Sequence, residues 1–174
     1  MRNRVRTILI TTAFLLIVLI VAVVPVSAQG SGGRVYFGVL YDPVFHVPDE
    51  TSGAGAHFDV SRKLVERTTT RVFAVGEVGF NTFDSGTIAS FLGGGRVAAQ
   101  INPKMSPFFQ FLFGAQHCCD STDLAFQPGI GFDYAWLAKV TVRAQIDFRR
   151  VFYDGGSESE TRLSFGIVIP LRVD

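Results

Sequence analysis

The segment from Val140 to Arg149 alternates strictly between apolar and polar side chains. Its even positions hold Val, Val, Ala, Ile and Phe, and its odd positions hold Thr, Arg, Gln, Asp and Arg. A β-strand turns successive side chains to opposite faces, so this segment predicts a sheet with one apolar and one ionic face. The whole pattern, Lys139–Phe152, is longer than an ordinary strand of about five or six residues and approaches the length that crosses a bilayer.

Similar strand-like segments recur along the chain, each bounded by turn residues. They cover residues 34–41, 54–65, 70–83, 87–101, 106–117, 124–136, 138–153 and 161–173. The stretches between them have no helical period. An even number of antiparallel strands joined by short links predicts an all-β fold, an eight-stranded antiparallel up-and-down barrel.

The links between these segments differ in size. The first, fifth and seventh links are long or rich in Gly, Ser and Asp, whereas the second, fourth and sixth are tight; the third link is short and breaks this alternation. Transmembrane barrels have short periplasmic turns and longer extracellular loops. With a periplasmic N-terminus, the odd-numbered links, which are acidic, are therefore expected to face out of the cell.

The N-terminal residues have the pattern of a secretory signal peptide. Three arginines precede an apolar run from Ile8 to Val24, and Val26 and Ala28 occupy the positions of a small-residue cleavage site. An uncleaved membrane anchor is the alternative, because the apolar run is long. A mature chain of this length fits one domain. The predicted division is a signal peptide at residues 1–28, a flexible lead-in at 29–33 and an outer-membrane β-barrel domain at 34–174.

The charge of the chain gives no sign of a nucleic-acid partner. The formal net charge is +1 for the whole sequence and about −2 without the three arginines of the presequence, and no basic tail is present. The polar positions of the strands carry Gly, Gln, Ser and Arg rather than the Lys, Glu and Thr of a water-facing sheet. This composition indicates that the polar face does not meet bulk water.

Volume and charge together decide which face of the barrel points inward. The chain has 17 phenylalanines, which would overfill an eight-stranded barrel, whose interior is just wide enough for side chains. An arginine that faces lipid at the bilayer midplane costs about 2–4 kcal/mol, so the arginines must point inward beside carboxylates. We predict a transmembrane barrel with an interior polar network, either a simple plug or a gated ion path. Its members are Arg71, Glu77, Arg96, Asp133, Arg143, Asp147, Arg149 and Arg162.

The last three strand segments carry a family resemblance. Gln127–Tyr134, Val142–Arg149 and Arg162–Val168 are similar to the corresponding strands of the small porin-like outer-membrane β-barrel superfamily, the outer-membrane protein A and opacity type. The resemblance covers roughly the whole mature chain. One departure is the C-terminus Leu171–Asp174, because such barrels usually finish with an aromatic residue.

The resemblance implies a location and partners. It implies an integral protein of the cell outer membrane that contacts outer-membrane lipid and is inserted by the barrel-assembly machinery with periplasmic chaperones. It also implies a non-enzymatic role in envelope integrity or surface interaction. The sequence does not indicate an oligomeric state.

Few residues suggest further chemistry. Cys118 and Cys119 are candidates for a disulfide in an oxidising compartment, and no ligand spacing near them predicts a metal site. His46 and His57 flank the first long link and, with Ser52, suggest a lipid hydrolase, but no activated-nucleophile signature accompanies them. We therefore expect solvated loop histidines and predict no catalytic residue, cofactor or metal.

Two alternative functions follow from the same residues. One is a soluble periplasmic carrier of the lipocalin kind, which would place the apolar face inside; the chain lacks that family's Gly-x-Trp near the first strand. The other is a lipid-modifying outer-membrane enzyme.

Overall fold

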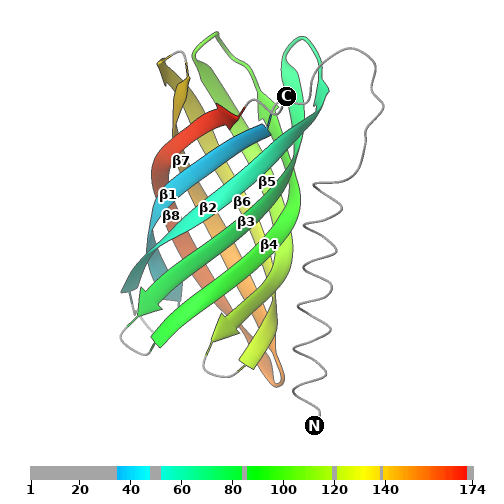
Figure 1. The fold of residues 1–174 in the computed structure, drawn as a ribbon. Coiled ribbons are helices and arrows are strands. Elements are labelled where there is room, and N and C mark those ends of the chain that lie inside the picture. The colour runs from blue at the N-terminus through cyan, green and yellow to red at the C-terminus, as the bar shows by residue number, and fades with distance from the viewer. Residues whose placement is uncertain (1–34, 48–51, 84–85, 119–120, 138, 172–174) are drawn as a thin grey trace.

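The computed structural model describes residues 35–47, 52–83, 86–118, 121–137 and 139–171, which form one closed β-barrel (Figure 1). The predicted signal peptide, the lead-in, His46's side chain and Cys119 lie outside what is described. Within the described residues no helix is long and apolar enough to cross a membrane. The strands are β1 (Val35–Val47), β2 (Ser52–Glu66), β3 (Thr70–Phe83), β4 (Gly86–Ala99), β5 (Met105–Cys118), β6 (Ser121–Leu137), β7 (Val140–Tyr153) and β8 (Gly156–Leu171).

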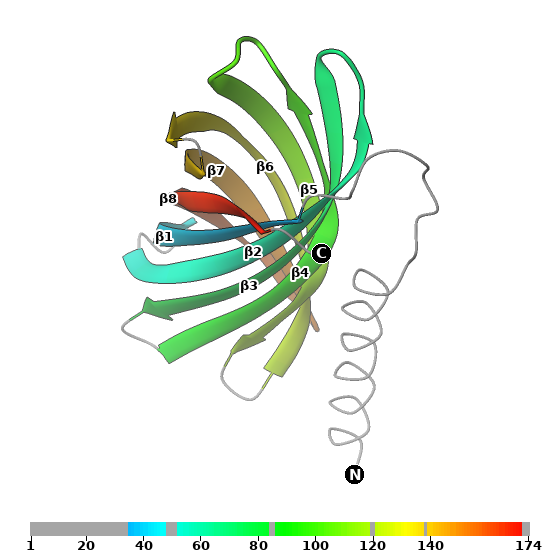
Figure 2. The ribbon, with the colours of Figure 1, turned by 45° about the horizontal axis from the view of Figure 1, so that its top comes forward.

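Each strand pairs with its neighbour in the sequence, and β1 closes the ring against β8. All these pairings are antiparallel, so the connection is up and down throughout. The predicted fold class is confirmed. We call the end at which β1 begins and β8 ends the termini end, which Figure 2 brings forward, and the opposite end the distal end.

The links at the distal end are shorter than the sequence predicts. Residues 154–160 are expected to form a link, but β8 begins at Gly156, and β7 pairs with it as far as Tyr153↔Gly156. Gly155 takes a left-handed φ of 114°, which lets two residues make this turn. The polar residues from Ser157 to Glu160 resemble a loop in composition, yet their backbones continue the ladder. The length argument for the orientation is therefore lost, and the orientation stays a prediction.

The two faces of the sheet differ as the alternation predicts. On β5, Phe109, Phe111 and Phe113 are each about half exposed, whereas Gln110 between them is fully buried. Large exposed apolar side chains occur on every strand and form a belt around the barrel, for example Val39, Phe58, Phe80, Val97, Phe111, Ile130, Phe148 and Phe165. So large an apolar surface is incompatible with water and is the surface that a bilayer covers. The soluble-carrier alternative, which needs the apolar face inside, is wrong.

The barrel interior is not wholly polar. Eight buried apolar residues form a cluster that includes Phe73 and Phe108, and a second cluster joins Phe83 to Ile88. These three phenylalanines occupy inward positions of their strands, unlike the lipid-facing majority. The interior therefore has apolar packing at several levels around a charged centre.

Candidate functional site: the charged interior of the barrel

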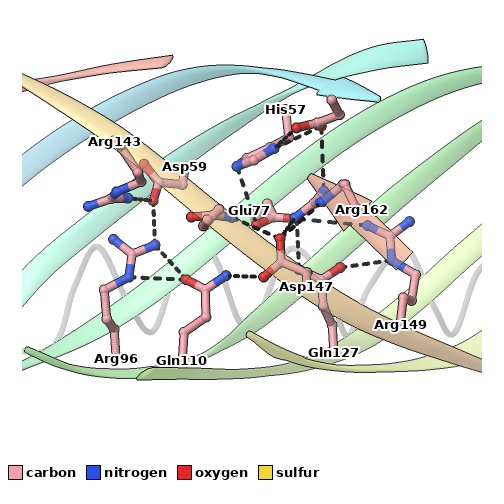
Figure 3. Close-up of polar contacts among 12 residues, drawn as sticks. His57, Asp59, Glu77, Arg96, Gln110, Gln127, Arg143, Asp147, Arg149 and Arg162 are labelled. Carbon is pink, nitrogen blue, oxygen red and sulfur yellow. Dashed lines mark hydrogen bonds and ion pairs between the residues drawn. The ribbon is translucent and has the colours of Figure 1, made fainter. Parts of the chain in front are cut away.

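The inward positions of all eight strands build one set of polar side chains, which we call the lumen network. Fourteen of its side chains are buried, and the fifteenth, Asp133, is 22% exposed. The network comprises Asp42, His57, Asp59, Glu77, Arg96, Gln110, Gln116, Gln127, Asp133, Arg143, Gln145, Asp147, Arg149, Glu160 and Arg162. Each strand contributes at least one member, so the network joins the wall of the barrel across its width (Figure 3).

Asp59 organises the half of the network nearer the termini end. Its Oδ2 accepts hydrogen bonds from Arg96 at 2.7 Å and from Arg143 at 2.5 Å. Arg143 donates through Nε and Nη2 to Asp133, at 2.7 and 2.9 Å. The guanidinium groups of Arg96 and Arg143 both lie over the ring of Phe108, 4.7 and 4.9 Å from its centroid. The ring face and the shared carboxylate together offset the repulsion between the two cations.

Arg162 organises the other half. Its Nη2 donates to Glu77 and to Asp147, both at 2.8 Å, and its Nη1 lies 3.6 Å from Asp42. Only 2% of its surface is exposed. A guanidinium with three carboxylates around it is heavily compensated, which is the condition under which a buried charge is tolerated.

Gln110 connects the two halves. Its side-chain carbonyl accepts from Arg96, at 2.7 Å from Nη2, and its amide donates to Asp147 at 2.9 Å. Figure 3 shows Gln110 between these two residues. An amide has both a donor and an acceptor, so it can join a cation of one half to an anion of the other.

Arg149 extends the network with hydrogen bonds to two glutamines. Its Nε donates to Gln127 at 2.8 Å and its Nη1 to Gln116 at 3.0 Å. Gln116 in turn donates to Glu160 at 2.9 Å. Glutamine side chains therefore carry the connection from Arg149 toward the β7–β8 hairpin.

His57 lies inside the network and not in a solvated loop, so that prediction is wrong. It is fully buried; its Nδ1 donates to Asp42 at 2.8 Å, and its Nε2 lies 3.7 Å from Glu77. A carboxylate only accepts hydrogen bonds, so the Nδ1 atom carries a proton. His57 already lay within the predicted strand 54–65, and the error was to assign it to the link instead of following its alternation with Ala56 and Phe58, which gives it the inward side.

The fully buried charges nearly cancel. Among the described buried side chains there are five carboxylates and four guanidinium groups. The carboxylates are Asp42, Asp59, Glu77, Asp147 and Glu160. Near-neutrality inside a low-dielectric lumen is what allows so many charges to stay buried together.

The termini end of the lumen is different, because it holds a cavity of about 120 Å³ that we call the vestibule. Arg96, Arg143 and Asp133 of the lumen network form part of its wall, and Arg71 and Lys104 line the rest of its charged surface. Arg71 donates to the hydroxyl of Ser106 at 2.6 Å. Neither Arg71 nor Lys104 forms an ion pair within the described part of the chain.

Of the predicted interior residues, all but Arg71 lie in the lumen network. Arg71 also points inward, but its side chain lines the vestibule and does not join the lumen network. The prediction missed Asp42, His57, Asp59 and Glu160. Asp59 had a usable signal, because His57, Asp59 and Ser61 alternate with apolar residues; Asp42 and Glu160 lay beyond the predicted strand ends. The candidate disulfide involves Cys119, which lies outside the described residues.

Comparison with solved structures supports the same fold. Neisserial surface protein A superposes with a TM-score of 0.59 at 12% identity, covering 81% of this chain and 99% of that one. The outer-membrane enzyme PagL superposes with a TM-score of 0.56 at 11% identity, covering 77% and 99%. Ail, the attachment invasion locus protein of Yersinia pestis, gives a TM-score of 0.48 at 12% identity over 79% and 97%.

No family model and no curated protein sequence matches the chain. At these low identities the structural matches establish the fold, which is that of the small outer-membrane β-barrels. This confirms the fold that the resemblance implies. The fold and the apolar belt together indicate a lipid-embedded protein of the bacterial outer membrane.

Proposed function

We propose that this outer-membrane β-barrel is a non-enzymatic structural protein that contributes to envelope integrity or to interactions at the cell surface. Its interior acts as a plug of paired charges and its exterior as a lipid anchor. Insertion by the barrel-assembly machinery, with periplasmic chaperones, belongs to the same proposal. The proposal goes beyond the fold, which proteins with very different roles share.

The observation that carries this proposal is that Arg162 of β8 reaches across the lumen to Glu77 on β3. This guanidinium contacts carboxylates from three strands, Asp42 on β1, Glu77 on β3 and Asp147 on β7. A side chain held from three sides crosses the lumen where an ion path would have to run. An eight-stranded barrel is narrow enough for such side chains to fill it, which favours a plug over a gated path.

The enzyme alternative depends on His57, whose environment argues against a catalytic role. The imidazole is fully buried, and both of its nitrogens face carboxylates of the lumen network. Ser52, the suggested nucleophile, is exposed at the first residue of β2, five positions away along a strand. A base must reach the proton that it abstracts, within hydrogen-bond distance or through one water. PagL is described as an enzyme, but its likeness to this chain concerns the fold.

The enzyme question is tested with the full chain refolded into vesicles of outer-membrane lipid. We expect lipid composition, followed by mass spectrometry, to change no faster than in vesicles without protein. A matched sample of His57→Ala serves as the control. Acyl-chain release by the wild type that is lost in His57→Ala would overturn the non-enzymatic assignment.

The plug is tested by recording conductance across planar bilayers. We expect the wild type to give no stable channels. Arg162→Ala, which shortens the side chain that crosses the lumen, is expected to give small, irregular openings if it folds, and heat-modifiable gel migration reports folding. Steady channels in the wild type would replace the plug by an ion path.

The cellular role is tested by removing the gene and restoring it in matched strains. Loss of envelope integrity is measured as entry of a dye that intact outer membranes exclude, and surface interaction as adhesion to a matrix. We expect a defect in at least one assay that the wild-type gene restores. Absence of any defect in both assays would contradict the proposal.

A further inference from the structure

We propose that the vestibule is a binding site for a small oxyanion of the phosphate type, supplied either as the free ion or as a lipid headgroup. This site is additional to the plug and to the structural role proposed above. It depends on four observations: an excess of positive charge, buried guanidinium groups, a donor that is not saturated, and a cavity of suitable size.

The charge balance of the vestibule is positive. Its lining includes the cations Arg71, Arg96, Lys104 and Arg143 and one carboxylate, Asp133. Asp59, which lies behind the wall, neutralises one further charge. The formal balance is then four positive against two negative groups, or +2. The rest of the lumen network holds four carboxylates and two guanidinium groups, so the positive surplus is confined to the vestibule, and an anion is the ligand that the vestibule favours.

The cations differ in how firmly they are held. Arg96 and Arg143 are each only 2% exposed and are fixed by Asp59, so they form a rigid rear wall. Arg71 and Lys104 are tied to no carboxylate in the described structure, and they line the same cavity from β3 and from the link 100–104. A rigid positive wall facing two cations without carboxylate partners is suited to an anion placed between them.

Arg71 supplies the directional donors. One of its amino groups donates to Ser106, while its buried Nε has no hydrogen-bond partner among the described residues. A guanidinium presents its N–H groups as a planar fork that matches two oxygens of a phosphate or a carboxylate. The hydroxyl groups of Ser61, Ser106 and Thr141 also line the cavity and add neutral donors.

The size of the vestibule fits a small ligand. A cavity needs a volume of about 10–15 Å³ to hold one buried water. The vestibule, at about 120 Å³, therefore holds several waters or one tetrahedral oxyanion. The cavity lies at the termini end, where Tyr36 near the start of β1 and Val168 near the end of β8 both reach it. A free ion would enter from water at this mouth, and a headgroup would reach over the rim of the barrel.

The proposal is tested by titrating the full-length barrel, refolded in an uncharged detergent, with inorganic phosphate at constant ionic strength. Calorimetry is expected to show one saturable site. Arg71→Gln and Lys104→Gln should each raise the dissociation constant, Arg71→Gln by about tenfold or more, the range expected when one charge-assisted donor is lost. Arg67→Gln is the matched control, because Arg67 is exposed on the 67–69 link and does not line the cavity. The dissociation constant of Arg67→Gln for phosphate should stay within about twofold of the wild-type value.

Heat-modifiable gel migration establishes that each variant is folded before titration. Lys104 is exposed on a link, so Lys104→Gln keeps the test available even if a strand variant fails to fold. Absence of saturable phosphate binding by the wild type would overturn the proposal. An equal loss of affinity in all three variants would overturn it too, because that pattern reflects general surface charge.

A second arm distinguishes the two sources of the oxyanion. The phosphate titration is repeated with the barrel in vesicles of phosphatidylcholine, with and without an anionic phospholipid. A headgroup that occupies the vestibule should weaken phosphate binding when the anionic lipid is present, and Arg71→Gln should remove that competition. Equal phosphate affinity in both vesicles would assign the site to the free ion.

Discussion

Arg162 and Arg71 are the same residue type at inward positions of one barrel, but they lie in opposite environments. Arg162 is buried and has three carboxylates within 3.6 Å. Arg71 is partly buried beside a cavity and donates to a serine hydroxyl. The first arginine is surrounded by carboxylates that compensate its charge, and the second belongs to a surplus of cations.

The difference teaches how one lumen can serve two purposes. Where each guanidinium is packed among carboxylates, as around Arg162, the charges hold the strands together. Where charges are unmatched and a cavity remains, as around Arg71, the same chemistry is free for binding. Stability should therefore depend on the first region and anion affinity on the second.

The largest effect is expected from Arg162→Met. Its removal leaves Glu77 and Asp147 without their main counter-charge, so the free energy of unfolding should fall by about 3–5 kcal/mol. Urea unfolding from lipid vesicles, followed by tryptophan fluorescence, measures the change. Arg150→Met is the matched control, since Arg150 is exposed and bonds Ser157; it should change the unfolding free energy by about 0.5 kcal/mol or less. Equal losses in both variants would erase the contrast between buried and exposed arginines.

A smaller effect is expected from Gly129→Ala. It tests how tightly the side chains around Asp147 and Arg162, which we call the paired region, are packed. A Cβ at Gly129 would clash with Oδ1 of Asp147, the atom that accepts from Gln110. Asp147 must then move away from its partners, and the unfolding free energy should fall by about 1–3 kcal/mol, as is common for overpacking. Gly76→Ala is the control, because a Cβ there meets nothing within 4 Å. Equal free energies of unfolding for Gly129→Ala and Gly76→Ala would show that the side chains around Asp147 are loosely packed.

Asp133→Asn acts at the border between the two regions. Asp133 is 22% exposed, and Arg143 keeps its second partner Asp59, so the loss of stability should be about 1 kcal/mol or less. The same change removes the carboxylate from the vestibule wall and should strengthen phosphate binding several-fold, measured by calorimetry. Asp154→Asn, at the distal end, provides the control. Weaker phosphate binding in Asp133→Asn would contradict the assignment of the surplus charge.

The smallest effect on stability is expected from Arg71→Gln. Its described side-chain partner is a hydroxyl, and a glutamine amide can also donate a hydrogen bond, so unfolding should change by about 0.5 kcal/mol or less. The urea experiment used for Arg162→Met measures it directly. A loss as large as that of Arg162→Met would place Arg71 in the paired region after all.

The alternation of residues determined much of this molecule on its own. Which side of each strand is apolar follows from local sequence, because successive side chains always point to opposite faces. That period predicts which side chains point inward, such as Arg96, Arg143 and Arg162. It also predicts which side chains face lipid, such as Phe109, Phe111 and Phe113. The number of strands and the membrane location also required no tertiary information.

The ends of the strands were harder to predict, because composition and backbone pairing disagree there. Asp42 and Glu160 look like link residues, yet the ladder of β1 with its neighbours carries both into the barrel. His57 differs from them, because it lies inside the predicted strand 54–65, where its alternation with Ala56 and Phe58 already indicates the inward side. Where a strand ends depends on how far it stays paired with its neighbour, and the sequence of one strand does not reveal this by itself.

Tertiary structure alone decided which charges meet. Arg71 and Arg96 both occupy inward positions by their sequence period, but only Arg96 reaches Asp59, which comes from β2, two strands away around the ring. The register and closure of the barrel set the level of each side chain along the axis. Those levels produced a centre rich in carboxylates and a vestibule rich in cations, and a local alternation pattern contains no information about either.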